Sequence, residues 1–322
     1  MNQGDSASFY PSKLLLFGEH TVIQGSQALA MPLWQYGGSW QYDDDKTKQY
    51  DLPKFLEYLK KGVENEDFNL DTEGVERELS RGLYFDSNVP RGYGTGSSGV
   101  LVAAIYTVFG MKRKMRSRLE SDDLVVVKNE MGKMESYFHG ASSGFDPLIS
   151  YVRKPVIIRK DRSIELLETV KNDISVFLLD TKIQRKAEPL ISIFIEKMKM
   201  PEYKTLVINE LVPNVDDAIA AYLQNQPNLV FEAVHNISLF QHRFFPEAIP
   251  LSFKNIWLEG LAGNDYKLKL CGAGGGGFIL GFTRNLSQTK EILAKSGFQV
   301  VTILQGFETL GEFFKKNTVT TS

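Results

Sequence analysis

Apolar runs and one amphipathic segment organise the first part of the chain. The run KLLLF at 13–17 ends at Gly18, which predicts a buried strand. Apolar and aromatic residues between 28 and 42 predict further sheet. From 51 to 61 the leucines and a phenylalanine recur at helical spacing, so this segment is expected to be a helix with one buried face.

Longer apolar segments follow in the second and third quarters of the chain. The segment 100–109 is apolar on nearly every position, which predicts a buried helix. Segment 121–138 opens with serine and aspartates suited to capping and predicts one long helix. The stretch 185–245 is mainly helical and is expected to break at its prolines. At 266–282 the pattern is strand, glycine turn, strand.

Length and element order together predict two closely packed domains. A chain of 322 residues exceeds what one ordinary core accommodates. Strand-rich sequence gives way to the helical block near 170, so the expected domains are 1–170 and 171–322. Strands and helices are segregated rather than strictly alternating, which predicts an α+β class.

Charge and composition limit the cellular compartment and the classes of partner that the protein is expected to have. Thirty-seven basic and 39 acidic residues give a net charge of −2, which offers no long-range attraction for nucleic acid or an anionic membrane. The basic run 112–118 lacks interleaved aromatic residues, so we interpret it as a solvated loop. The single cysteine, Cys271, and the absence of a signal-like start or a 20-residue apolar run predict a cytoplasmic protein without membrane partners. Its four histidines lack zinc-site spacing.

The loop RGYGTGSSGV at 91–100 is the strongest chemical signal. Its glycines match a dinucleotide-binding pattern, as does the glycine run at 272–277, but neither has the required strand and helix context. Glycines let backbone N–H groups approach an anion, and the following helix N-terminus adds positive potential. Ser97 and Ser98 can donate to phosphate or ligate Mg²⁺. A glycine turn with serine capping the helix is the alternative interpretation.

Two further stretches carry the other groups that phosphoryl transfer needs. That chemistry requires a cation, a metal-ligating carboxylate and an acid that orients or deprotonates the acceptor hydroxyl. Lys13 starts a predicted strand, Glu135 lies near the end of a predicted helix, and Asp146 follows in a Gly/Ser turn. These three are the candidates, although the sequence does not show that they converge. Asp146 as a turn residue before Pro147 is the structural alternative.

Three motifs in order resemble those of the GHMP kinases. They are KLLLFGEHTVIQG at 13–25, PRGYGTGSSG at 90–99 and KLCGAGGGGFILGF at 269–282. The resemblance implies a two-domain α+β fold: an N-terminal domain like ribosomal protein S5 domain 2 with a left-handed βαβ unit, and a ferredoxin-like C-terminal domain. It also implies ATP, bound in a syn conformation, Mg²⁺ and a small-molecule alcohol substrate. A homodimer is left open.

Carried over residue by residue, the resemblance makes Asp146 the catalytic base and Lys13 its partner on the acceptor oxygen. Glu135 would ligate Mg²⁺ with Ser97 or Ser98. The expected nucleotide-binding residues are Pro90, Gly92, Gly94, Thr95, Gly96, Ser97, Ser98 and Gly99. The expected acceptor-binding residues are Glu19, His20, Ser143, Gly144, Gly274 and Gly275.

Within the family, the motifs are most similar to those of mevalonate kinases, because Val22 follows Gly-Glu-His-Thr where galactokinases have a sugar-binding aspartate. The resemblance therefore implies phosphorylation of the primary hydroxyl of mevalonate. The alternatives are another acceptor, such as a sugar or phosphomevalonate, and a catalytically silent ligand-binding protein of this fold. The chain departs from the family pattern at five positions: Thr95 for Leu, Gly99 for Ala, Ser142 for Pro, and Lys186 and Ala187 for Ser-Thr.

Overall fold

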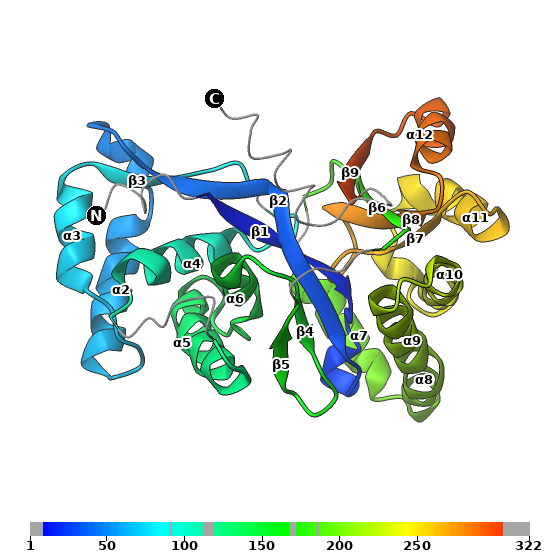
Figure 1. Cartoon of the computed structure of the whole chain (residues 1–322), viewed down its shortest axis with the longest axis horizontal. Coiled ribbons are helices and arrows are strands. Elements are labelled where there is room, and N and C mark those ends of the chain that lie inside the picture. Colours follow the sequence, from blue (N-terminus) through cyan, green and yellow to red (C-terminus); the bar gives the residue numbers. More distant parts are fainter. Residues whose placement is uncertain (1–8, 91, 112–118, 168–171, 185–186, 305–322) are drawn as a thin grey trace. The chain divides into compact units, whose positions relative to one another are not determined.

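A computed structural model describes residues 9–90, 92–111, 119–167, 172–184 and 187–304 (Figure 1). The described residues form two compact units. The first comprises residues up to 13 together with 31–90 and 95–154, and the second comprises the rest. The predicted division at 170, the basic run 112–118 and Lys186 lie outside the described residues. A division into two sequence-continuous domains at that point stays a prediction.

Long strands form the frame of the first sheet. Strand β1 (Tyr10–Phe17) and strand β2 (Ala28–Tyr42) confirm the predicted sheet, and each passes from one unit into the other. In the first unit β2 pairs antiparallel with β3 (Leu83–Ser87), with Tyr42 opposite Leu83. The full strand order is β1-β2-β4-β5, with β3 on β2.

Helices cover the first unit's part of this sheet on one side (Figure 1). Helix α2 (Leu52–Glu64) has the predicted buried face, and α3 (Thr72–Ser80) begins with the Asp71 side chain accepting from the Gly74 N–H. Helix α4 (Ser97–Phe109) is buried on most of its positions, as its apolar sequence predicts. It packs against α5 (Ser121–His139) and α6 (Phe145–Val152). This packing brings the N-termini of α4 and α6 together.

The second unit contains an antiparallel sheet in the order β7-β8-β6-β9. Its strands are β6 (Ser175–Asp180), β7 (Lys267–Leu270), β8 (Phe278–Thr283) and β9 (Val300–Leu304). The strand, glycine turn, strand prediction is confirmed, because β7 and β8 flank the glycine run as an antiparallel pair. A short hairpin of β4 (Val156–Ile158) and β5 (Ile164–Leu166) pairs with the start of β2.

The described residues between 187 and 245 are mainly helical, as predicted, and two further helices follow them in this unit. Its helices are α7 (Ala187–Met198), α8 (Pro201–Leu206), α9 (Val212–Leu223), α10 (Pro227–Phe244), α11 (Lys254–Ala262) and α12 (Leu286–Lys295). Short helical turns lie at Val22–Gln24, Lys46–Gln49, Pro246–Ala248 and Leu251–Phe253.

The predicted breaks at Pro201 and Pro227 are confirmed, because α7 ends at Met198 and α9 ends at Leu223, shortly before these prolines. Pro201 and Pro227 begin helices, where a missing N–H costs nothing, and Pro189 lies in the first turn of α7. The break expected at Pro213 is wrong. A π-helical turn (Val207–Leu211) joins α8 to α9, and such turns accommodate a proline that cannot donate to the preceding turn.

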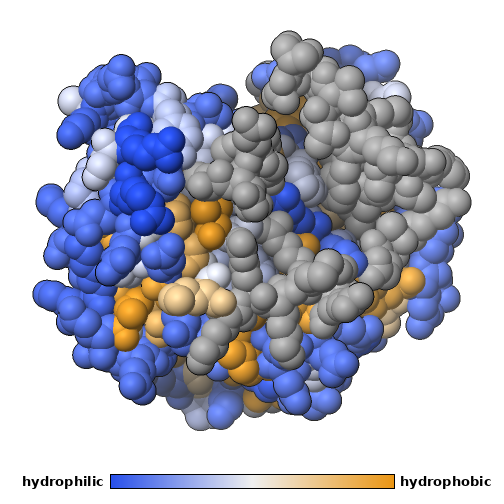
Figure 2. Space-filling model, turned by 60° about the vertical axis from the view of Figure 1, so that its left-hand side comes forward, coloured by the Kyte–Doolittle hydropathy of each residue, from blue (hydrophilic) through white to orange (hydrophobic). Residues whose placement is uncertain are grey.

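Hydrophilic residues cover most of the described surface on the face that Figure 2 presents, with hydrophobic residues in smaller patches between them. Within the described ranges, every helix is too short or too polar to cross a membrane. Cys271 is buried directly after β7.

Candidate functional site

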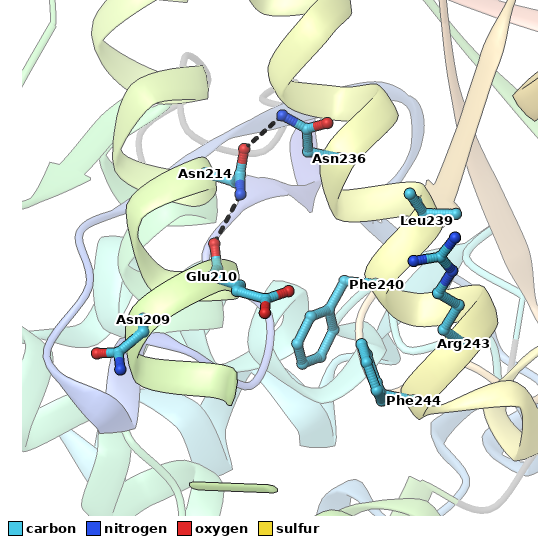
Figure 3. A pocket seen from close by; sticks show the side chains of 8 residues that line it. All are labelled: Asn209, Glu210, Asn214, Asn236, Leu239, Phe240, Arg243 and Phe244. Atoms are coloured by element: carbon cyan, nitrogen blue, oxygen red, sulfur yellow. Dashed lines mark hydrogen bonds between the residues drawn. The ribbon is translucent and has the colours of Figure 1, made fainter. Parts of the chain in front are cut away.

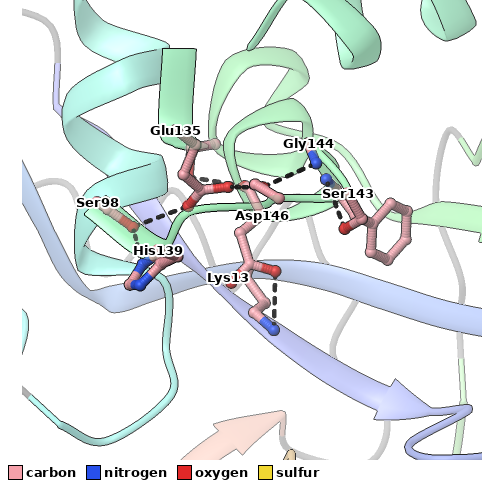
Figure 4. Close-up of polar contacts among 10 residues, drawn as sticks. Lys13, Ser98, Glu135, His139, Ser143, Gly144 and Asp146 are labelled. Carbon is pink, nitrogen blue, oxygen red and sulfur yellow. Dashed lines mark hydrogen bonds and ion pairs between the residues drawn. The ribbon is translucent and has the colours of Figure 1, made fainter. Parts of the chain in front are cut away.

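Lys13 and Asp146 form an ion pair in the first unit. The Lys13 Nζ lies 2.9 Å from Asp146 Oδ1, and the side chains are 12% and 30% exposed (Figure 4). Strand β1 supplies Lys13, whose backbone N–H donates to the Thr95 carbonyl at 3.3 Å. Asp146 lies in the first turn of α6, where the helix dipole stabilises a carboxylate. A cation and a carboxylate thus meet at a partly open position beside the glycine loop.

Glu135 lies at the centre of a second polar cluster in the same unit. Its side chain is buried on α5, and Oε1 accepts a hydrogen bond from the Ser98 hydroxyl at 2.8 Å. The Ser98 hydroxyl is also 3.0 Å from His139 Nε2 (Figure 4). The other carboxylate oxygen, Oε2, accepts from the Ser142 hydroxyl at 2.5 Å. Residues from α4, α5 and the following loop therefore converge on one carboxylate.

Burial raises the pKa of the Glu135 carboxyl, and the nearby Asp146 carboxylate raises it further. Hydrogen bonds from Ser142 and Ser98 and the charge of His139 act in the opposite direction. Among the described residues no three histidine, cysteine or acidic side chains cluster as a metal site. The donor set at Glu135 is a carboxylate with serine hydroxyls, which fits Mg²⁺ because this ion prefers oxygen ligands and is usually bound by one or two carboxylates plus phosphates.

The C-terminal part of the glycine loop lies against Asp146. Gly96 immediately precedes α4, and a Cβ built on it would lie 3.0 Å from Asp146 Oδ2. Ser97 begins the helix with an exposed side chain, whereas Thr95 is buried. Gly99 lies against the start of α6, because a Cβ built on it would be 2.9 Å from the Pro147 nitrogen. The absence of side chains at these positions lets α4 and α6 approach.

The other part of the loop is divided between the units. Pro90 is half-buried at the end of the first unit's segment, and Gly92 and Gly94 are exposed residues of the second unit. Tyr93, between these glycines, donates its hydroxyl to Asp180 Oδ1 at 3.0 Å and packs on Phe278, with ring centroids 5.0 Å apart. Tyr93 therefore attaches this stretch to the second sheet.

Glu19 and His20 belong to the second unit and are held by the interior. Glu19 Oε1 accepts from Lys269 Nζ at 2.6 Å, and the two side chains are 3% and 1% exposed. Burial raises the pKa of the Glu19 carboxyl, while Lys269 opposes this rise. The His20 ring packs between Phe194 and Phe245, at centroid distances of 4.8 and 5.3 Å. The Glu19 side chain is thus buried in this unit, and the half-buried His20 ring packs on its aromatic residues.

The remaining predicted acceptor-binding residues lie in two loops. Gly274 and Gly275 follow β7, and the Gly275 N–H donates to the Ala248 carbonyl at 2.6 Å. Ser143 is exposed before α6, and its hydroxyl accepts from the Phe145 N–H at 3.3 Å. Gly144 has φ +70°, and a Cβ there would lie 1.9 Å from the Lys128 carbonyl, so this turn requires glycine.

Two residues that hydrogen-bond predicted site residues were not themselves predicted: Ser142, which donates to Glu135, and Lys269, which donates to Glu19. Ser142 attracted notice only as a departure from the family motif, and nothing in its spacing indicates that it contacts Glu135. Lys269 was not predicted as a partner of Glu19. It alternates with leucines in the segment YKLKLC at 266–271, as Lys267 does, and a lysine buried in such a strand needs hydrogen-bond acceptors. Lys267 finds backbone carbonyls and Lys269 finds the Glu19 carboxylate, so the sequence pattern alone does not separate the two.

The described cavities include one between α9 and α10 in the second unit (Figure 3). It has a volume of about 230 Å³, and Phe240 and Phe244 contribute aromatic lining. Asn236 donates to Asn214 at 2.9 Å across it. None of the predicted site residues lines this cavity.

Comparison with known proteins identifies relatives over nearly the whole chain. The mevalonate kinase of Thermococcus sibiricus is 25% identical over 326 residues, covering 91% of this chain and 94% of the relative. The L. major mevalonate kinase, solved with R-mevalonate, superposes with a TM-score of 0.59 at 16% identity, covering 93% of this chain and 95% of that one. No family model matches the sequence.

A phosphomevalonate kinase has a similar fold. The Streptococcus pneumoniae enzyme, solved with phosphomevalonate and AMPPNP, superposes with a TM-score of 0.62 at 14% identity, covering 92% of this chain and 99% of that one. The relatives are thus kinases that share one fold and differ in acceptor. The chain has the two-domain α+β fold of the GHMP kinases, and its sequence resembles the mevalonate kinases of that family.

Proposed function

We propose that this protein is an ATP- and Mg²⁺-dependent phosphotransferase that phosphorylates the primary hydroxyl of mevalonate. The observation that carries the proposal is the Lys13–Asp146 pair, 2.9 Å apart, beside the N-terminus of α4. The sequence similarity to mevalonate kinases over 91% of the chain supports mevalonate as the acceptor. The proposed setting is cytoplasmic.

In the proposed reaction, Asp146 accepts the proton of the acceptor hydroxyl as its oxygen forms a bond to the γ-phosphorus of ATP. The bond between the γ-phosphorus and the bridging oxygen breaks, and ADP leaves with that electron pair. Lys13 stabilises the negative charge that develops on the attacking oxygen. Glu135 and Ser98 would hold Mg²⁺, which when bound neutralises phosphate charge. The N-terminus of α4 supplies further positive potential.

ADP release by the purified protein with Mg-ATP tests this proposal. Mevalonate, phosphomevalonate, galactose and homoserine are compared as acceptors. A signal that depends on mevalonate supports the proposal. A signal with phosphomevalonate alone would keep the phosphotransferase and replace its acceptor, which the similar fold of the S. pneumoniae enzyme makes the leading alternative. Silence with every acceptor would favour a ligand-binding protein without catalysis.

Gly99→Ala, which introduces the residue typical of the family, is expected to lower kcat about tenfold or more, because small displacements of a catalytic group are costly. The new Cβ would lie 2.9 Å from the Pro147 nitrogen and 3.0 Å from Asp146 Cβ, so the start of α6 must shift. Steady-state kinetics with saturating acceptor measure the change.

Gly297→Ala is the control for Gly99→Ala. Gly297 has open space around its Cβ position but φ +81°, so alanine there costs about 1–2 kcal/mol of stability. We expect that variant to unfold more easily and to keep its kcat. A Gly99→Ala variant with wild-type kcat would show that α6 tolerates the added methyl group.

A further inference from the structure

Ser142 lies between the two polar clusters of the first unit. Its hydroxyl donates to Glu135 Oε2 at 2.5 Å and accepts from the Gly144 N–H at 3.0 Å. A serine hydroxyl has one proton to donate and can accept at the same time, so both bonds form together. One side chain therefore connects the end of α5 to the residue that precedes α6.

The Glu135 end of this connection fixes the carboxylate. Ser98 donates to Oε1 at 2.8 Å and Ser142 to Oε2 at 2.5 Å, so each oxygen is held by a hydroxyl from a different segment. Glu135 is 4% exposed, which leaves water little access to replace a lost donor. Removing either hydroxyl frees the carboxylate to rotate about its last side-chain bond.

The Gly144 end fixes the loop that leads to Asp146. Gly144 lies against α5, with its Cβ position 1.9 Å from the Lys128 carbonyl. Lys128 Nζ also donates to the Ser143 carbonyl at 3.2 Å. Asp146 follows Gly144 by two residues and faces Lys13. The loop therefore contacts α5 at Ser142, Ser143 and Gly144. The contact at Ser142 is the one that involves Glu135.

We propose that Ser142 is a positioning residue that orients Glu135 toward a divalent cation and keeps it in register with the helix carrying Asp146. This inference rests on the proposed phosphotransferase function and adds a residue that the family motif does not supply, since that motif has proline at this place.

Ser142→Ala tests the inference through metal binding without turnover. Electron paramagnetic resonance counts free Mn²⁺ as it is titrated into the full-length protein with AMPPNP. Loss of a group that hydrogen-bonds a metal ligand typically weakens metal affinity about 10–100-fold, and we expect a loss in that range. Ser142→Thr retains the hydroxyl and is expected to restore the affinity. In steady-state kinetics, Ser142→Ala should need a higher Mg²⁺ concentration for half-maximal rate than the wild type or Ser142→Thr does.

Ser136→Ala is the matched control for a lost serine hydroxyl. Ser136 is on the same helix, next to Glu135, but its hydroxyl donates to the Gly132 carbonyl at 2.8 Å. We expect this variant to bind Mn²⁺ like the wild type. Circular dichroism of each variant establishes that it is folded, and Ser142→Gly, which also removes the hydroxyl, serves if Ser142→Ala does not fold.

Each outcome of the titration bears on the inference. Equal Mn²⁺ affinity in Ser142→Ala and wild type overturns it, as does a loss that Ser136→Ala shares. An absence of Mn²⁺ binding in the wild type overturns both this inference and the metal role of Glu135. A selective loss in Ser142→Ala without any mevalonate-dependent ADP release supports the role of Ser142 and removes only the proposed acceptor.

Discussion

Asp146→Asn is expected to lower kcat about 10²–10⁴-fold, the range that a positioned general base contributes. Asparagine preserves the size of the side chain and an oxygen that can accept from Lys13, which lies 2.9 Å away in the wild type. It cannot take the proton of the acceptor hydroxyl. The proposed ATP-binding groups are the glycine loop and the N-terminus of α4, which the substitution leaves in place, so we expect ATP affinity to stay near the wild-type value. Steady-state kinetics measure kcat, and calorimetry measures the affinity for ATP.

Asp67→Asn controls for the loss of an aspartate in an ion pair. Asp67 pairs with Lys133 at 2.8 Å in the same unit, but both side chains are exposed, and such pairs contribute about 0–1 kcal/mol. We expect this variant to keep its kcat and its stability. Wild-type turnover in Asp146→Asn would show that another group accepts the proton.

Hydrophobic periodicity predicts the main helices of the first unit closely. The expected helices at 51–61, 100–109 and 121–138 correspond to Leu52–Glu64, Ser97–Phe109 and Ser121–His139. Each helix has a local sequence signal. Helix α2 has apolar residues on one face, α4 is apolar on nearly every position, and α5 starts with acidic residues. Local sequence determines such features, so a single sequence suffices to predict them.

Contacts between distant residues are beyond what periodicity can predict. Lys13 and Asp146 are far apart in the sequence, and their contact depends on how α6 packs relative to β1. Resemblance to a family motif suggested their roles, but their separation of 2.9 Å is a product of the folded chain. The contact between Ser142 and Glu135 is still less predictable, because the motif has no hydroxyl there.

Glu19 illustrates how a motif residue can have a different environment from the expected one. Sequence reasoning places it with the acceptor, whereas in the structure its carboxylate is buried against Lys269. Its predicted contact with the acceptor stays a prediction. The burial of this pair gives it a testable effect on stability.

Lys269→Met is expected to reduce the free energy of unfolding by about 3–5 kcal/mol, because it leaves the Glu19 carboxylate buried and unpaired. The wild-type pair is 2.6 Å apart and almost fully buried. Methionine approximates the lysine stem and can still pack near Phe17, whose ring lies 5.9 Å from the Lys269 ammonium. Urea unfolding at neutral pH measures the loss.

Two further variants separate charge burial from packing. Glu19→Gln combined with Lys269→Met removes both charges, so we expect the double variant to be more stable than Lys269→Met alone. Lys133→Met removes a lysine from the exposed pair with Asp67, and it is expected to cost about 0–1 kcal/mol. A double variant as unstable as Lys269→Met would attribute the loss to packing.

The dependence on pH gives an independent test of the same ion pair. Burial already raises the pKa of Glu19 above its ordinary value of 4.5, and Lys269 opposes that rise. Without Lys269 the folded-state pKa must rise further, so between pH 4.5 and that higher value the folded variant binds more protons than the unfolded chain. The variant's stability should therefore be lost as pH increases through this window. The deficit relative to wild type should be greatest near neutral pH and smaller toward pH 4.5. A deficit that does not change with pH would mean that Glu19 finds another partner when Lys269 is removed.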